Sequence, residues 1–136
     1  MCVLTGLNKG AFSYCTGLTS ITVAKGNTKY HSAGNCLIET ESKTLIAGCK
    51  NSIIPTDGSV TSIGDGAFYG CTGLTNVTIP DSVTSIGSNA FYGCTGLTSI
   101  TFNGTIEQWN AISKGSYWAS SVPATQVICN DGPISI

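Results

Sequence analysis

Apolar residues recur along the middle of the chain with a period of 23 residues. Phe68 and Phe91 hold equal places in two successive units, and residues 64–79 and 87–102 are identical at 11 of 16 positions. Each unit ends in the pattern Leu-x-x-apolar-x-apolar, whose period of two predicts a short half-buried strand. A repeat of this length predicts a mostly β solenoid, in which each unit gives one strand to a parallel sheet and the strands stack about 23 residues apart.

One unit is longer than the others and contains an insertion at about residues 30–49. Two apolar runs, 36–38 and 44–47, lie on either side of the polar turn 39–43. Apolar runs joined by a short polar turn are typical of a β-hairpin. The sequence therefore predicts a hairpin that protrudes from the solenoid.

The repeat pattern stops after Asn103. Ile106, Trp109 and Ile112 are spaced by three, which predicts a short helix with Thr105 as its N-cap. Residues 125–129 then read as one more strand.

The chain divides into a solenoid at residues 1–103 and a C-terminal cap at 104–136, because an open solenoid must cover its last apolar layer. Leu4 and Leu7 align with apolar positions inside a later unit. We therefore expect the chain to start within a repeat, with more solenoid before Met1. The uncapped N-terminal coil makes self-association possible.

Charged residues are few and exclude several classes of function. The chain has 6 Lys and Arg residues, all of them Lys, against 7 Asp and Glu, for a net charge of -1. Scattered lysines form no stripe along a phosphate backbone, so we expect no nucleic-acid partner. No apolar run approaches the ~20 residues of a membrane span, so we expect no membrane insertion. The first ten residues lack a signal-peptide pattern, which leaves a cytosolic chain or a piece of a longer exported protein.

Seven cysteines raise the question of a disulfide, a metal or a reaction. Cys15, Cys71 and Cys94 each lie three residues after the repeat Phe and three before its Leu, both core positions. Equivalent side chains in a stack run parallel, which does not suit the disulfide torsion of about 90°. We therefore predict a buried, reduced ladder of thiols. Cys2 and Cys129, near the two ends, are expected to be the most exposed.

Metal and catalytic chemistry have little support in the sequence. His31 is the only histidine and no Cys-x-x-Cys occurs, whereas zinc needs four converging ligands. We expect no metal, no cofactor and no catalytic residue. Cys36 with His31 is the only pair that suggests a Cys-dependent hydrolase, which is a distant third interpretation.

Polar side chains on the outward strand positions form rows that suggest a binding face. The candidates are Thr22, Thr75, Asn76, Thr78, Thr98, Ser99 and Thr101. The simpler interpretation is that Thr and Ser are good solvent-facing β residues.

Two further candidates lie outside the rows. The hairpin tip carries Glu39, Glu41 and Lys43, and protruding loops often hold specificity. The predicted cap carries Tyr117 and Trp118, which would either anchor a partner or cover the last core layer.

The stretch from Ile63 to Leu97, IGDGAFYGCTGLTNVTIPDSVTSIGSNAFYGCTGL, resembles the BspA-type leucine-rich repeats of bacterial surface proteins. The resemblance implies a non-enzymatic binding or adhesion module at the cell surface. Its partner would be a host or bacterial surface protein or a glycan. The alternative is a terminal segment or spacer of a longer array, with no ligand of its own.

Overall fold

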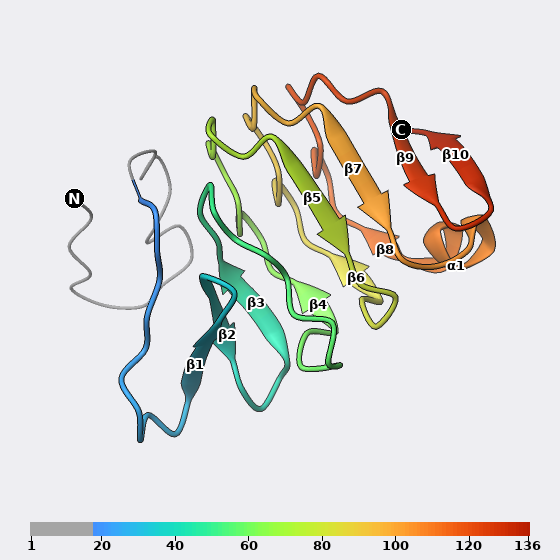
Figure 1. Ribbon diagram of the computed structural model, residues 1–136. Helices are drawn as coiled ribbons and strands as arrows, with labels where there is room; N and C mark the ends of the chain where they lie inside the picture. Colours follow the sequence, from blue (N-terminus) through green and yellow to red (C-terminus); the bar gives the residue numbers. More distant parts are fainter. Residues whose placement is uncertain (1–17) are drawn as a thin grey trace.

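The computed structural model describes residues 18–136. Within them the chain is mostly β and forms two sheets that lie face to face (Figure 1). One sheet has the spatial order β1 (Tyr30–Ala33), β2 (Cys36–Glu39), β3 (Thr44–Ala47), β4 (Ser62–Ile63), β6 (Ser85–Ile86) and β8 (Ser113–Lys114). The other has the order β10 (Gly132–Ser135), β9 (Gln126–Cys129), β7 (Ser99–Phe102) and β5 (Asn76–Ile79). Helix α1 (Ile106–Ala111) closes one end.

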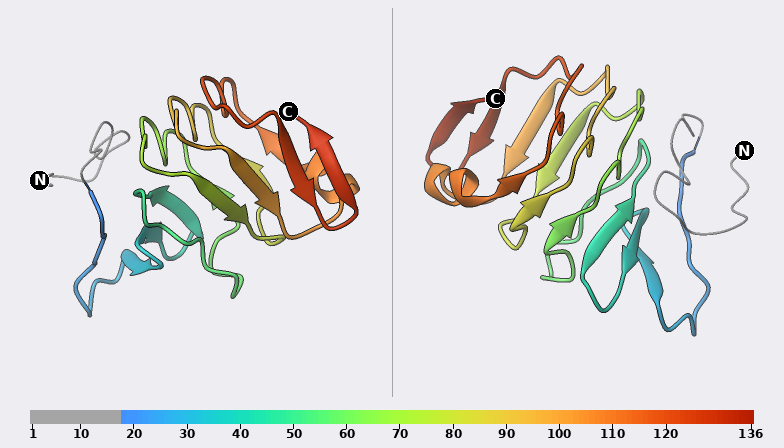
Figure 2. Two further views of the ribbon diagram at one scale, coloured as in Figure 1. Left: turned by 45° about the horizontal axis from the view of Figure 1, so that its top comes forward. Right: turned by 180° about the vertical axis from the view of Figure 1, so that it is seen from behind.

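Strands from successive units pair in parallel, which confirms the predicted parallel strands. Asn76 of β5 pairs with Ser99 of β7, and Ile100 of β7 pairs with Val127 of β9. On the opposite sheet β4, β6 and β8 pair in the same sense. Figure 2 shows the units side by side from two directions.

The core lies between the two sheets because alternate strand residues point inward. In β5, for example, Val77 and Ile79 are buried while their neighbours are exposed. The repeat phenylalanines fill the middle of the core. Phe68 and Phe91 stack with ring centroids 5.0 Å apart and an interplanar angle of 6°, an arrangement that stacked units produce directly.

In each unit a turn, at residues 66–70 in one unit, forms backbone hydrogen bonds to the next unit. The N–H groups of Gly66, Phe68 and Gly70 donate to carbonyls of the following unit over 2.7 to 2.9 Å. Gly66 and Gly70 have φ of 65° and 69°, values in the left-handed region where glycine has no steric penalty. Asn89, which takes the place of Gly66 one unit later, holds φ of 58°.

The predicted hairpin is present, but the prediction that it protrudes is wrong. Strands β2 and β3 pair antiparallel around the turn, with Ile38 opposite Leu45. Strand β3 also pairs in parallel with β4, so the hairpin extends the sheet. The reason is burial, since Ile38 and Leu45 are both 0% exposed and belong to the main core. Strand β1 adds a third antiparallel strand that the sequence did not indicate.

The helix forms as predicted with Thr105 as its N-cap. The Thr105 hydroxyl accepts from the Gln108 N–H over 3.1 Å, and the Gln108 side chain accepts from the Thr105 N–H over 2.8 Å, which is a capping box. At the other end, Nζ of Lys114 donates to the carbonyls of Trp109 and Ile112. Strand β9 fits the predicted final strand, whereas β8 and β10 were not predicted. The division of the chain at residue 104 stays a prediction.

Candidate binding surface

The outward side chains of β5, β7 and β9 form one continuous surface, which we call the outer sheet face. Its members are Asn76, Thr78, Ser99, Thr101, Gln126 and Ile128. Parallel pairing places Asn76 beside Ser99 and Thr78 beside Thr101, with Ile128 next to Thr101. The structure therefore brings four of the predicted face residues together on neighbouring strands.

Three hydroxyl groups of the outer sheet face make no hydrogen bond to the part of the chain that the structure describes. Within residues 18–136, the side chains of Thr78, Ser99 and Thr101 have no hydrogen-bond partner. Thr75 and Thr98, just before the strands, are partly engaged, since the Thr98 hydroxyl donates to the Thr75 carbonyl over 3.3 Å. A ligand that offers hydroxyl or amide groups would therefore find unpaired donors and acceptors on this face.

Thr22 does not join the outer sheet face. It is exposed but lies outside any strand, in a segment that contacts other residues. The Asn51 side chain donates to the Thr19 carbonyl, and Ser32 accepts from the Val23 N–H over 2.9 Å. The row that the sequence predicted therefore begins at β5, the edge strand of this sheet, and does not extend to Thr22.

The sequence analysis did not identify the part of the outer sheet face that lies on β9 and its neighbour β10. Ile128 is 40% exposed, and antiparallel pairing places Pro133 of β10 beside it and Ser135 beside Gln126. The available sequence signal was the predicted strand at residues 125–129, in which Gln126 and Ile128 share one face because strand side chains alternate. The face therefore ends in an apolar pair at Ile128 and Pro133.

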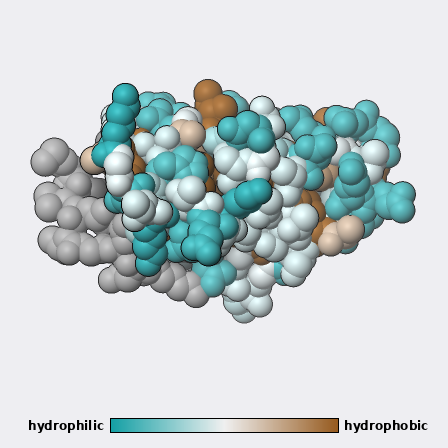
Figure 3. Space-filling view, turned by 90° about the horizontal axis from the view of Figure 1, so that it is seen from below, coloured by the Kyte–Doolittle hydropathy of each residue, from teal (hydrophilic) through white to brown (hydrophobic). Residues whose placement is uncertain are grey.

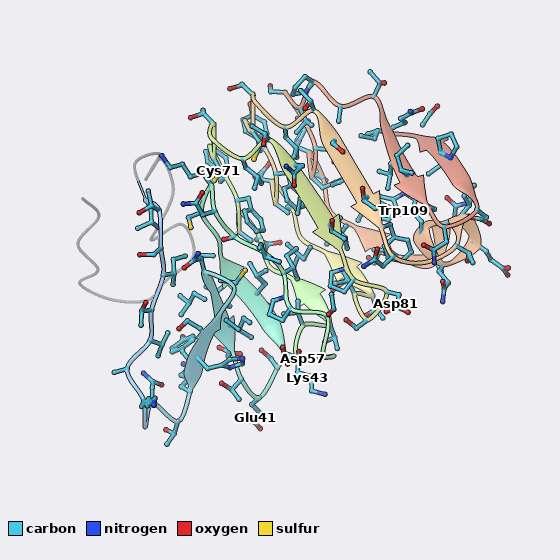
Figure 4. The ribbon with its side chains drawn as sticks, viewed as in Figure 1. Glu41, Lys43, Asp57, Cys71, Asp81 and Trp109 are labelled. Atoms are coloured by element: carbon cyan, nitrogen blue, oxygen red, sulfur yellow. The ribbon has the colours of Figure 1, made fainter. Side chains whose placement is uncertain are left out.

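The hairpin-tip candidates lie away from the outer sheet face. Figure 4 shows Glu41 and Lys43 at the lower end of the β2–β3 hairpin. Glu39 belongs to β2 and accepts from the Ser42 hydroxyl over 2.6 Å. A hollow of about 350 Å³ opens here, lined by Thr28, Lys29, Glu39 and Glu41. These charges are largely exposed, which makes each interaction weak in water.

A second hollow of about 210 Å³ lies between α1 and the turn at Asp81. Asp81 and Gln108 give it polar groups, while Phe102 and Ile112 give it apolar ones. Figure 3 shows the molecule from below, where polar and weakly polar residues dominate and hydrophobic residues appear in small patches. No residue predicted from the sequence as part of a site lines this hollow.

The repeat cysteines point into the core. Cys94 is 0% exposed and its Sγ donates to the Phe68 carbonyl over 3.0 Å, whereas Cys71 is partly buried. Burial raises the pKa of Cys94 to about 12 and that of Cys71 to about 11. Such thiols stay protonated and unreactive at neutral pH. Both are free thiols, so packing explains the repeated cysteine; Cys15 lies outside the described residues.

One cysteine prediction was wrong. Cys129 is only 6% exposed, because it occupies an inward position of β9 next to the last core layer. Nearness to the chain end therefore did not indicate exposure. Cys2, its predicted counterpart, lies outside the described residues, as does the N-terminal coil expected to self-associate.

Burial makes Cys36 an unfavourable nucleophile for the hydrolase pair. Cys36 is completely buried, and burial raises its pKa to about 11. His31 lies in β1, and its Nδ1 is 2.8 Å from the Thr40 hydroxyl. Within residues 18–136, no group of three or more His, Cys, Asp or Glu side chains could hold a metal ion. In the same range, no helix has the length and apolarity of a membrane span.

The two cap aromatics behave differently. Trp118 packs edge-on against Phe91, at 6.3 Å, and against Trp109, at 5.6 Å between ring centroids. It therefore covers the last aromatic layer of the core. Tyr117 is 69% exposed and is left available to a partner.

Comparisons with known proteins agree on the repeat. A family model described as "BspA type Leucine rich repeat region (6 copies)" matches residues 39–122. A leucine-rich repeat protein from Eubacterium ventriosum is similar with a TM-score of 0.53 and 22% identity, over 90% of this chain. This chain spans 39% of that protein's length. A leucine-rich repeat protein from Bacteroides capillosus has a TM-score of 0.50 and 23% identity, over 75% of this chain and 99% of its own. Among curated proteins, none matches.

Proposed function

Because the chain belongs to the BspA-type leucine-rich repeat family, we propose that it is a non-enzymatic binding module of a bacterial surface protein. Its units would continue a longer solenoid, and its ligand would meet the outer sheet face. The observation that carries this proposal is the set of hydroxyl groups on adjacent parallel strands, at Thr78, Ser99 and Thr101, that have no partner among residues 18–136.

The chemistry of the outer sheet face suggests the kind of ligand. The face carries hydroxyl and amide groups and no charge, with the apolar Ile128 at one side. Adjacent strands lie about 4.8 Å apart, so these groups repeat at a regular interval. A glycan or an extended protein surface, rich in neutral donors and acceptors, fits such a face better than an ionised ligand does.

The test is a binding screen of the purified chain against glycans, host matrix proteins and epithelial-surface proteins. The double variant Thr78→Lys/Thr101→Lys places two bulky charges on the face. A matched control, Thr72→Lys/Thr95→Lys, places two lysines at exposed turn positions with the same 23-residue spacing. The proposal expects ligand binding that the face variant loses and the control keeps, with unchanged circular dichroism in both. Equal ligand binding by both variants would refute the proposal that the outer sheet face binds the ligand.

A structural role is the second candidate, and one observation favours it. The edge-on packing of Trp118 against Phe91 and Trp109 supports a role of the C-terminal segment in covering the end of the core. In the same screen, a folded chain that binds nothing would favour this role. Exchange of residues 104–136 for another cap would then leave ligand binding by a longer parent protein unchanged.

A further inference from the structure

A hollow of about 210 Å³ between α1 and the turn after β5 has an apolar floor. Val83, Phe102 and Ile112 line it, and none of the three is more than 6% exposed. All three belong to the main core, and the Phe102 ring packs against that of Trp109 with 5.4 Å between centroids. The floor is therefore fixed before a ligand arrives, which lowers the entropic cost of binding.

The rim of the hollow carries two polar side chains, Asp81 and Gln108. Asp81 follows Pro80 in the turn after β5, and Figure 4 shows it at the lower edge of the molecule. The capping box holds Gln108, because its Oε1 accepts from the Thr105 N–H over 2.8 Å. In the described part of the chain, neither the Asp81 carboxylate nor Nε2 of Gln108 has a hydrogen-bond or ion-pair partner. The rim thus offers one charged acceptor and one oriented donor.

The charges around this end of the molecule favour a cation. Besides Asp81, Glu107 lies in the first turn of α1, and Asp131 accepts from the first N–H of that helix over 2.9 Å. Lys114 does not line the hollow, since its Nζ is held by two carbonyls at the end of α1 and lies 4.7 Å from the centroid of the Trp109 ring. Three acidic groups against one basic group give a negative local field.

We propose that the hollow receives a lysine side chain of a partner protein. The lysine ammonium pairs with the Asp81 carboxylate, and its methylene stem lies on the floor at Phe102 and Ile112. The Gln108 amide donates to a backbone carbonyl beside the lysine. A lysine side chain has a charged tip on an apolar stem, which is the combination that the rim and the floor of the hollow complement. The site is separate from the outer sheet face and does not depend on its function.

The open shape of the hollow favours a lysine on a protein surface over a free amine. Thr84 and Ala111 line it and are exposed, so its mouth faces water. An ion pair that stays in water is weak. The surface around a partner's lysine would cover the mouth and exclude water from the ion pair, as the surroundings of an interface hot spot do.

The experiment uses the blocked peptide acetyl-Gly-Ser-Lys-Ser-Gly-amide, titrated into the ¹⁵N-labelled chain. We expect saturable amide shifts at residues 81, 84, 108 and 111, with a Kd of about 1–10 mM because few ligand atoms make contact. A peptide with norleucine in place of lysine keeps the stem without the ammonium, and should bind at least fivefold more weakly. n-Butylammonium lacks the peptide backbone, and should bind at least threefold more weakly than the lysine peptide.

Variants of two equivalent turns make the test specific. Asp81→Asn keeps the size of the side chain and removes its charge, so it should weaken binding of the lysine peptide at least fivefold. Asp57→Asn is the matched control, since Asp57 lies in the corresponding turn of the preceding unit and does not line the hollow. It should leave binding unchanged. A nuclear Overhauser contact between Phe102 and Trp109 checks that each variant keeps the fold.

Several results would overturn the proposal. Shifts that are absent from residues 81, 84, 108 and 111, equal binding by the norleucine peptide, or an equal effect of the two Asn variants would exclude a lysine in the hollow. Binding of n-butylammonium as tight as that of the peptide would make the ligand a free amine. The same shifts on concentration of the chain alone would mean that a second copy supplies the lysine.

Discussion

Removal of the Phe91 ring tests the stacked core most severely. Phe91 is 0% exposed, stacks on Phe68 at 5.0 Å and meets Trp118 edge-on at 6.3 Å. Truncation of a buried Phe to Ala costs about 3–5 kcal/mol. Each aromatic contact contributes about 0.5–1.5 kcal/mol beyond burial. Because Phe91→Ala loses two such contacts, we expect a loss of about 4–5 kcal/mol in the free energy of unfolding.

The assay is urea unfolding followed by tryptophan fluorescence and circular dichroism. With a slope of about 1–3 kcal/mol per molar urea, such a loss moves the midpoint by about 1.3–5 M. Tyr92→Ala is the matched control, since Tyr92 is half-buried and, among residues 18–136, stacks only on Tyr69, at 5.2 Å. Its cost should be about 1–2 kcal/mol.

A milder variant keeps the test informative if Phe91→Ala does not fold. Phe91→Leu keeps most of the volume and should cost roughly 1–1.5 kcal/mol. If Phe91→Ala cost no more than Tyr92→Ala, Phe91 would not be buried between two aromatic layers, and the described stacking of units would be wrong.

Three further predictions concern a buried thiol, a close approach between neighbouring units and the end of α1. At pH 8 the Cys94 thiolate fraction should be roughly a thousandfold below that of an exposed thiol, so Ellman's reagent should reach Cys71 first and Cys94 only on unfolding. Gly87→Ala should destabilise by about 1–3 kcal/mol and more than Gly64→Ala, measured by urea unfolding, because its Cβ would lie 2.7 Å from a backbone carbon. Lys114→Met should cost about 1–2 kcal/mol in thermal unfolding, since it removes both side-chain hydrogen bonds to the end of α1.

The sequence predicted those parts of the fold in which the repeat is strongest. The strands β5 and β7 lie where the period-two ending of each unit placed them, and α1 begins at its N-cap. In each case a local pattern of apolar or capping residues agrees with the tertiary packing.

Other elements were missed because their sequences carry no period of their own. Strands β4, β6 and β8 have two residues each, too few to show alternation. Strand β10 contains Gly132 and Pro133, which usually mark a turn. Pro133 is tolerated there because β10 is an edge strand. Only the neighbouring strand defines such elements, and a neighbour is not visible in local sequence.

The outer sheet face was partly predictable from the repeat. Its polar rows follow from the repeat, so Asn76, Thr78, Ser99 and Thr101 were identified correctly as outward residues.

The central claim is that each 23-residue unit stacks on the last and adds one row to both sheets. Insertion of a second copy of residues 65–87 directly after Gly87 tests it, with hydrogen exchange read by mass spectrometry. The account predicts a folded chain of higher stability, in which the inserted unit protects its strand amides as well as β5 and β7 do. An inserted unit that exchanges freely, while the rest of the chain stays protected, would contradict the stacking of equivalent units.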